Sequence, residues 1–352
     1  MSNKCKLGLI FGGASSEYEV SLLSVSSVLA NIDREKYEIY RIGITKDGRM
    51  FYYTGEDSRI AKNEWQGEGC IPCVLSPDRA HHGFVILKEQ PEIVYLDCVF
   101  PVLHGKNGED GTIQGLFAMA GIPFVGCGQL ASAACMDKVT THTMLDKAGV
   151  LGAKWRSVTA YEYAKDAESF LDEVEHALGY PCFVKPANAG SSVGVTKASD
   201  REALKEAMDL ALIHDSKVIV EEMIVGREIE CAVLGNEDPI ASCLGEIAPS
   251  NDFYDYNAKY IDGKSLTYVP ARVTEKESDE IRRIAVQAYK IMGCAGFSRV
   301  DFFLCENGEI LLNEINTIPG FTSISMYPQL FVESGVPYSE LIDRLIAYAL
   351  AR

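Results

Sequence analysis

Two short apolar segments with alternating side chains flank the pair Asn307-Gly308, between residues 298 and 316. Such a pair between alternating segments is a strong signal for a two-residue hairpin turn of type I′. Counting outward from this turn places Asp301 directly opposite Glu314. The same count pairs Cys305 with Ile310 and Phe303 with Leu312. The chain must therefore hold two carboxylates side by side on one face of a sheet.

These two carboxylates need positive charge nearby. Opposed Cβ atoms in a hairpin lie about 4.5–5.5 Å apart, and like charges so placed destabilise the sheet. Because side chains alternate along a strand, Asn316 shares the face of Glu314, and Arg299 shares the face of Asp301. Oxygen ligands without histidine or thiolate suit Mg²⁺ that bridges to phosphates. We therefore interpret Asp301, Glu314 and Asn316 as metal ligands rather than as a solvated polar face.

Residues 1–138 predict an open α/β domain. An apolar strand at 6–11 is followed by Gly12-Gly13 and by a helix with the capping-box spacing of Ser16 and Glu19. Strand signals at 37–44, 93–103 and 122–125 then alternate with helical segments. The third glycine of a dinucleotide-binding motif is missing, so such a site is not predicted.

Residues 139–225 predict a mixed domain around a glycine-rich loop, and residues 226–352 predict a strand-rich domain. In the former, helices are expected at 140–148, 164–178 and 200–211, strands at 154–159, 182–185 and 218–222, and the loop at 187–195. In the latter, strands are expected at 228–234 and 241–247, a polar loop at 250–264, helices at 275–292 and 339–351, and the hairpin. The predicted fold class combines α/β with α+β.

Groups that bind phosphate occur around the glycine-rich loop. Lys185 ends a predicted buried strand just before the loop, and Lys138 stands at the start of the second domain. The small residues 190–194 (GSSVG) would let main-chain amides close over phosphate oxygens. Taken singly, each lysine also fits a solvated surface, and the loop also fits a plain turn.

Composition limits the class of protein. The 352 residues are 47% hydrophobic and 24% charged, which is typical of a globular chain too long for a single core. A net charge of −17 argues against nucleic acid or an anionic membrane as partner, because both require clustered basic residues. The apolar runs fall short of the roughly 20 residues that span a bilayer, and the N-terminus lacks a signal-peptide core, so we expect a cytoplasmic location.

The eleven cysteines predict free thiols rather than disulfides or a metal site. They are scattered and mostly embedded in apolar segments. Cys70 and Cys73 form a single CxxC in a stretch expected to be irregular, without a second pair to complete a zinc site.

Six motifs, in the same order along nearly the whole chain, resemble the D-alanine–D-alanine ligase family of ATP-grasp enzymes. They are GGASSEYEVS at 12–21, HGKNGEDG at 104–111, MDK at 136–138, VKP at 184–186 with GSSVG at 190–194, FYDYNAKY at 253–260 and NEINTIPG at 313–320. The resemblance implies three domains with ATP between the second and third. It also implies a homodimer, with D-alanine and ATP as substrates.

The resemblance implies a reaction in two steps. The carboxylate of a first D-alanine would attack the γ-phosphate of ATP, and the amine of a second D-amino acid would displace phosphate from the acyl phosphate. Residues 221–224 would form a strand edge that reads adenine through its backbone, and Glu228 would bind ribose. The full set implied for ATP is Lys138, Lys185, Ser191, Ser192, Glu221, Glu222, Met223, Ile224, Glu228, Lys259 and Asn313. Two Mg²⁺ ions, replaceable by Mn²⁺, would bind Asp301, Glu314 and Asn316.

The resemblance also assigns the groups around the amino acids. Glu17 would anchor the ammonium of the first D-alanine, with His104 in support. Arg299 and the Gly320 amide would stabilise the tetrahedral intermediate. Tyr260 would reach both Ser191 and Glu17 and close the pocket against water.

The second substrate depends on Ser325 and Met326. Ser325 would hold its carboxylate. Relatives that use D-serine tend to carry a basic residue where this chain has Met326, whose apolar side chain suits a methyl group. D-alanine is therefore predicted as the second substrate, with D-serine as the alternative.

Two other classes of function remain to be distinguished. A different ATP-grasp ligase would share the hairpin and the lysines but not Glu17 or the Tyr260 loop. A catalytically silent nucleotide-binding module would have lost at least one of five groups, and all five are present: Asp301, Glu314, Asn316, Lys185 and Arg299.

Overall fold

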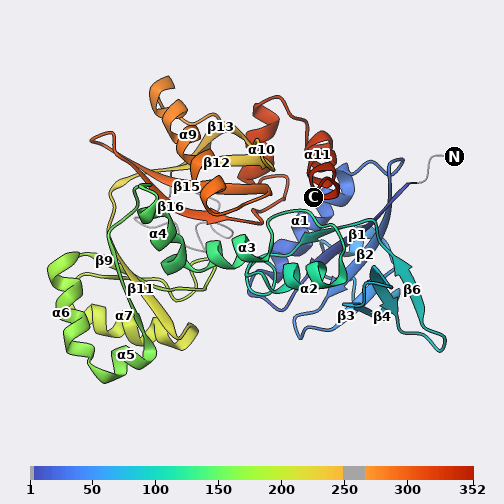
Figure 1. The fold of residues 1–352 in the computed structure, drawn as a ribbon, viewed down its shortest axis with the longest axis horizontal. Coiled ribbons are helices and arrows are strands. Elements are labelled where there is room, and N and C mark those ends of the chain that lie inside the picture. Colours follow the sequence, from blue (N-terminus) through green and yellow to red (C-terminus); the bar gives the residue numbers. More distant parts are fainter. Residues whose placement is uncertain (1–3, 249–265) are drawn as a thin grey trace.

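A computed structural model of the protein describes residues 4–248 and 266–352. Three β-sheets of seven, four and five strands, with helices packed against them, form the fold (Figure 1). The predicted combination of α/β and α+β structure is confirmed. The polar loop expected at 250–264 lies outside the described residues.

The first sheet has the order β6-β5-β4-β3-β2-β1-β7. Its strands are β1 (Cys5–Gly12), β2 (Tyr37–Ile44), β3 (Met50–Tyr53), β4 (Cys70–Leu75), β5 (Gly83–Ile86), β6 (Glu92–Tyr95) and β7 (Cys98–Val102). Strand β1 pairs in parallel with β2 and β7, whereas β2 to β6 pair antiparallel. The helices of this part are α1 (Tyr18–Asn31), the short 3₁₀ helix η1 (Asp57–Arg59), α2 (Thr112–Ala120) and α3 (Gln129–Met136).

Four predictions for this part of the chain are wrong. The strand expected at 93–103 is two strands, β6 and β7, which form opposite edges of the sheet. Helix α1 begins at Tyr18 with Glu17 at its N-cap and without a side-chain cap, and Glu19 forms an ion pair with Lys46 instead of a capping box. The segment 122–125 contributes only an isolated bridge, between Phe124 and Val99. The CxxC lies in strand β4 rather than in irregular structure.

The second sheet has the order β10-β9-β11-β8. Its elements are α4 (Lys138–Lys147), β8 (Trp155–Thr159), α5 (Ala160–Lys165), α6 (Ala167–Ala177), β9 (Cys182–Pro186), β10 (Thr196–Ala198), α7 (Arg201–His214) and β11 (Lys217–Glu222). The single helix predicted at 164–178 is two helices, because Asp166 leaves helical geometry and its carboxylate caps α6 through the Ser169 amide. Apolar side chains of α6 and α7 pack against the sheet in one buried cluster.

The third sheet has the order β14-β13-β12-β15-β16. Its elements are β12 (Gly226–Gly235), β13 (Ile240–Ala248), β14 (Leu266–Tyr268), α9 (Glu275–Ile291), β15 (Gly296–Cys305), β16 (Ile310–Asn316), α10 (Met326–Glu333) and α11 (Tyr338–Leu350). Helix α9 has a complete capping box between Thr274 and Glu277. Figure 1 shows α9 and α10 beside this sheet and α11 next to the first sheet.

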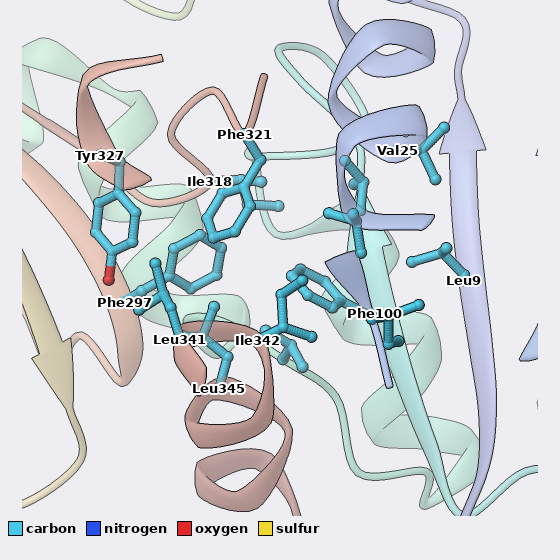
Figure 2. Close-up of a cluster of buried hydrophobic side chains, with 14 of the residues drawn as sticks. Leu9, Val25, Phe100, Phe297, Ile318, Phe321, Tyr327, Leu341, Ile342 and Leu345 are labelled. Atoms are coloured by element: carbon cyan, nitrogen blue, oxygen red, sulfur yellow. The ribbon is translucent and has the colours of Figure 1, made fainter. Parts of the chain in front are cut away.

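A continuous apolar core joins the first and third sheets. It contains Leu9 of β1, Val25 of α1, Phe100 of β7 and Phe297 of β15 together with side chains of α10 and α11. Figure 2 shows Leu341, Ile342 and Leu345 of α11 next to Phe297 of β15 and Phe100 of β7. The rings of Phe100 and Phe297 meet edge to face, with centroids 6.4 Å apart. Helix α11, near the C-terminus, therefore packs against the N-terminal sheet as well as the third sheet.

All eleven cysteines are free, as predicted, and seven of them are buried. None of the helices within 4–248 and 266–352 combines the length and apolar character needed to cross a membrane.

Candidate active site

A cavity of about 1360 Å³ lies where the three sheets meet. Its wall includes Glu17 from the start of α1, Lys185 from β9 and Glu314 from β16. Of the site residues predicted within the described ranges, Asp301 is absent from the wall, because it lies buried behind Arg299 and Asn316. The remaining two predicted residues, Lys259 and Tyr260, lie outside the described residues.

Strands β15 and β16 bring the two acids of the hairpin together, with Asp301 opposite Glu314 and Arg299 opposite Asn316. The predicted turn, however, is wrong. Cys305 pairs with Glu309 rather than Ile310, and only Gly308 of the turn has a positive φ, so the loop has three residues. Leu312 lies opposite Phe302 and Glu314 lies opposite Asp301, so Asn313 is an extra residue of β16 that has no partner position on β15. This β-bulge returns the strand pairing to the predicted register.

A similar correction applies to the pair next to the turn. Phe303 lies opposite Leu311, not Leu312. The bulge at Asn313 thus compensates the extra turn residue, and the face that carries the acids is the predicted one.

Arg299 neutralises part of the acidic face. Its Nε and Nη2 donate to the two carboxylate oxygens of Asp301, each at 2.7 Å, and Nε lies 3.1 Å from Oε2 of Glu230 on β12. Asn316 donates to Asp301 at 2.9 Å and to Glu314 at 3.4 Å. Asp301 and Glu230 therefore both face the Arg299 guanidinium, and Glu314 lies beside them through Asn316. Carboxylate and amide oxygens of this kind suit Mg²⁺. The described residues contain no cluster of three or more His, Cys, Asp and Glu side chains with metal-site geometry.

The two predicted phosphate-binding lysines also line the cavity. Nζ of Lys138, at the N-terminus of α4, donates to the Ala189 carbonyl at 2.7 Å, which links it to the glycine-rich loop. Burial and the charge of nearby Lys185 lower the pKa of Lys138, although Glu314 acts in the opposite direction. A partly buried ammonium of this kind favours an anionic ligand.

Lys185 is paired with Glu221, at 2.6 Å, and the second oxygen of Glu221 lies 3.0 Å from Nε2 of His142. Burial disfavours ionisation of Glu221, but Lys185 and His142 outweigh it and hold the pKa of Glu221 well below its usual range. The prediction that 221–224 is a strand edge is wrong for its first half, because β11 lies between β9 and β8. Only Met223 and Ile224 follow the strand, and the Met223 amide donates to the Pro181 carbonyl at 3.3 Å.

Other residues predicted to contact ATP also line this part of the cavity. Glu222 accepts a hydrogen bond from the Lys154 amide at 2.9 Å, Glu228 lies in β12, and Asn313 is the bulge residue of β16. Ser192 lies in the glycine-rich loop with a φ of +58°. Their position in the wall of the cavity is compatible with the predicted contacts to ATP.

The glycine-rich loop reaches across the cavity to the first sheet. Ser191, with a φ of +50°, donates from its hydroxyl to Oε1 of Glu17 at 2.5 Å. Glycines lie on both sides of this carboxylate. A Cβ atom would lie 2.4 Å from Glu17 Oε2 at Gly105 and 2.9 Å from it at Gly190. The Glu17 carboxylate therefore fits only because both neighbours lack a side chain.

His104 connects α1 with the segment that follows β16. Its Nδ1 lies 3.0 Å from the Ile318 carbonyl, which can only accept, so Nδ1 carries the proton. Burial lowers the pKa of His104, although Glu17 acts in the opposite direction, and the neutral ring can accept at Nε2 from the Ser24 hydroxyl at 3.0 Å. His104 contacts the Ile318 backbone, and its effect on Glu17 is electrostatic.

Glu109 is a site residue that the predictions omitted, although it lies inside the HGKNGEDG motif. Its carboxylate accepts from the Gly105 amide at 2.7 Å and from the Ile318 amide at 3.2 Å. Burial and the nearby Glu17 carboxylate raise the pKa of Glu109 to about 8. His142, Glu230 and Ser24 were also omitted, because contacts between distant segments give no local sequence signal.

The segment after Ile318 holds the last predicted residues. The Ser325 hydroxyl accepts from the Thr322 amide at 3.0 Å and lies 2.8 Å from where a Cβ of Gly320 would be. Met326 is buried, with Sδ placed 2.5 Å from where a Cβ of Gly245 would be, so its side chain packs on β13 as well as lining the cavity.

Known protein families match this chain over most of its length. Family models described as D-ala D-ala ligase N-terminus and D-ala D-ala ligase C-terminus match residues 6–127 and 144–347. The chain is 50% identical to a D-alanine–D-alanine ligase of Acetivibrio thermocellus, an alignment covering 100% of this chain and 97% of the relative.

Two solved structures are similar over nearly the full length. The VanG D-Ala:D-Ser ligase from Enterococcus faecalis has a TM-score of 0.91 at 45% identity, covering 99% of this chain and 100% of that one. The D-alanine–D-alanine ligase from Coxiella burnetii has a TM-score of 0.87 at 33% identity, covering 100% and 95%. Family models and relatives over the whole length agree that this chain belongs to the D-alanine–D-alanine ligase family.

Proposed function

We propose that the protein joins two D-alanines to D-alanyl-D-alanine and converts ATP to ADP and phosphate in the same reaction. One observation carries this proposal: a single cavity is lined by Glu17, by Lys138 and Lys185, and by Arg299 and Glu314 of the hairpin. An ammonium-binding carboxylate thus shares one space with phosphate-binding lysines and an acidic oxygen site. A silent nucleotide-binding module would not need all of these groups.

In the first step, a carboxylate oxygen of D-alanine attacks the γ-phosphorus of ATP and ADP leaves, which yields D-alanyl phosphate. Glu17 binds the ammonium of this D-alanine, and Lys138 and Lys185 bind phosphate oxygens. In the second step, the amine of the second amino acid attacks the acyl carbonyl, loses a proton and displaces phosphate. Arg299 and the Gly320 amide bind the carbonyl oxygen as it becomes negative.

Mg²⁺ fits the acidic face of the hairpin, where Asp301, Glu314 and Asn316 would hold two ions. When bound, the ions offset the negative charge of the phosphate oxygens while the carboxylate approaches. The Arg299–Asp301 pair would then share Asp301 with a metal, and the Asn316 amide would turn its oxygen toward it.

ATP contacts on the other side would come from the glycine-rich loop through Ser191 and Ser192, from residues 221–224 and from Glu228. Lys259, Tyr260 and Asn313 complete the proposed set. The three sheets support domain limits at 1–138, 139–225 and 226–352, although α11 of the third domain packs against the first.

The second amino acid decides between two activities. The buried thioether of Met326 favours a methyl group, and hence D-alanine, while Ser325 would hold the carboxylate. The second candidate is a D-alanine–D-serine ligase, because the Enterococcus faecalis neighbour at 45% identity is named for that pair. Release of phosphate with ATP, Mg²⁺ and each of D-alanine, D-serine and D-lactate decides it. A much higher kcat/KM for D-serine than for D-alanine would overturn the first assignment.

Two further properties belong to the same proposal. The product would serve as a peptidoglycan precursor made in the cytoplasm. The protein would act as a homodimer through the first sheet, where Val74, Val85 and Ile93 align across β4, β5 and β6, and Val74 and Ile93 are half exposed. Analytical ultracentrifugation of Ile93→Glu against the unaltered protein tests this, since the charge should shift a dimer toward monomer.

A further inference from the structure

The backbone from Ile318 to Phe321 is held by groups that come from the opposite end of the chain. The Ile318 amide donates to Glu109 at 3.2 Å, and the Ile318 carbonyl accepts from His104 at 3.0 Å. The Phe321 amide donates to the hydroxyl of Ser24, on α1, at 3.2 Å. The amide and the carbonyl of Ile318 and the amide of Phe321 are therefore all hydrogen-bonded to side chains of the first domain.

These contacts form one connected network. The Ser24 hydroxyl accepts from Phe321 and donates to Nε2 of neutral His104, whose Nδ1–H donates to Ile318. Ser24 is completely buried and His104 is almost so. Buried hydrogen bonds linked in this way restrict movement more than isolated ones do.

Gly320 lies inside the bound segment and lines the cavity. Pro319 has no amide hydrogen, and within residues 4–248 and 266–352 we find no acceptor for the Gly320 amide. The network thus fixes the backbone at Ile318 and Phe321, on both sides of the Gly320 amide. Among the described residues this amide makes no hydrogen bond. A donor that is already in place before charge develops stabilises an oxyanion at no cost of reorganisation.

We propose that Ser24 and Glu109 are positioning residues for the Gly320 amide, which they aim at the acyl oxygen together with His104. Neither residue touches the reacting atoms. This inference rests on the proposed ligase function, in which Gly320 is an oxyanion donor. It assigns the first domain a part in the second chemical step, beyond binding the first amino acid.

The test compares Ser24→Ala and Glu109→Ala with the matched control Ser242→Ala. Ser242 is likewise buried and accepts a backbone amide, from Ala232 at 3.1 Å, but it lies in β13 away from the cavity. Misplacement of a reacting group by about 1 Å costs roughly 100-fold in rate, so we expect kcat to fall by about 10-fold to 100-fold in the two positioning variants. KM for ATP should stay within about twofold, because the network does not reach the lysines that bind phosphate.

A second measurement separates positioning from general loss of structure. A phosphinate analogue of the dipeptide carries a tetrahedral centre with a negative oxygen, so its affinity should fall by the same factor as kcat/KM. Affinity for ADP should not change. Glu109→Gln keeps the volume and one acceptor oxygen, so it should lie between Glu109→Ala and the unaltered protein, and it serves if the alanine variant does not fold.

Hydrogen exchange keeps this inference separate from the ligase proposal. The amides of Ile318 and Phe321 should exchange faster in Glu109→Ala and Ser24→Ala respectively, whether or not the protein makes a dipeptide. Faster exchange with unchanged kcat and phosphinate affinity would overturn the positioning role. Unchanged exchange would overturn the network itself. Failure of the unaltered protein to ligate any D-amino acid would overturn the proposed function and the positioning role that rests on it, while faster exchange in the variants would still show the network.

Discussion

The hydroxyl of Ser191 donates a hydrogen bond of 2.5 Å to the carboxylate of Glu17, although the two residues lie 174 positions apart. This contact fastens the glycine-rich loop to the first domain across the cavity. Because both partners belong to the proposed site, we expect the bond to couple closure of the loop to the binding of the first amino acid.

Ser191→Ala removes that bond. We expect KM for the first D-alanine to rise and kcat to fall by roughly 10-fold to 100-fold, because the loop no longer fixes the carboxylate that binds the ammonium. The free energy of unfolding should change by less than about 1.5 kcal/mol, the typical value of one hydrogen bond. Steady-state kinetics and urea unfolding measure the two effects, and kinetics equal to those of the unaltered protein would remove the contact from the mechanism.

Gly105→Ala should nearly abolish activity. Its Cβ would lie 2.4 Å from Oε2 of Glu17, so the carboxylate must move. The control is Gly48→Ala, in the turn between β2 and β3, where φ is +83° and no atom lies within 4 Å of the new Cβ. Both variants carry the cost of a left-handed alanine, about 1–2 kcal/mol, so similar melting temperatures with different activity would show that the clash with Glu17 matters. Equal activity would contradict this.

Glu314→Ala should lower ADP formation by roughly 100-fold or more, since the nucleotide loses charge neutralisation by the metal. Glu306→Ala changes an exposed acid in the turn of the same hairpin and should leave the rate unchanged. ADP release measured across a Mg²⁺ titration separates weak metal binding from loss of the site. Turnover of Glu314→Ala close to that of Glu306→Ala would exclude the metal role.

Glu109 should make the protein less stable as the pH rises. The pKa of its carboxyl is raised from 4.5 to about 8 in the folded state. The folded protein therefore keeps a proton that the unfolded chain releases, and the free energy of unfolding falls between about pH 4.5 and pH 8. Glu109→Gln lacks this group, so its stability should fall less over the same range. Urea unfolding at several pH values tests this, and equal slopes for both proteins would argue against the raised pKa.

The sequence predicts regular elements well where a pattern is long and local. Strand β2 and the buried strands β9 and β11 lie within one residue of the expected limits, because apolar runs bounded by turns have few alternatives. The short strands β3, β4 and β5 were not predicted. Their pairing with one another, rather than their own residues, makes them strands.

The hairpin shows how the pairing of two residues can be predicted correctly from an incorrect turn. The turn at Gly308 holds one residue more than predicted, and the bulge at Asn313 adds one on the other strand. Neither feature is visible in the alternation of side chains, yet together they restore the pairing of Asp301 with Glu314. Long-range contacts such as Glu109 with Ile318 lie beyond any local pattern and required the structure.

The burial of α11 against α1 and β7 also affects how the chain acquires its fold. A ribosome synthesises α1 and β7 long before it releases α11, so the apolar surface that Leu341 and Ile342 finally cover stays open during translation. The nascent N-terminal half must remain unaggregated until the last helix docks. The first and third sheets, which share this core, should accordingly unfold in one cooperative thermal transition. Deletion of α11 alone should unfold the first domain.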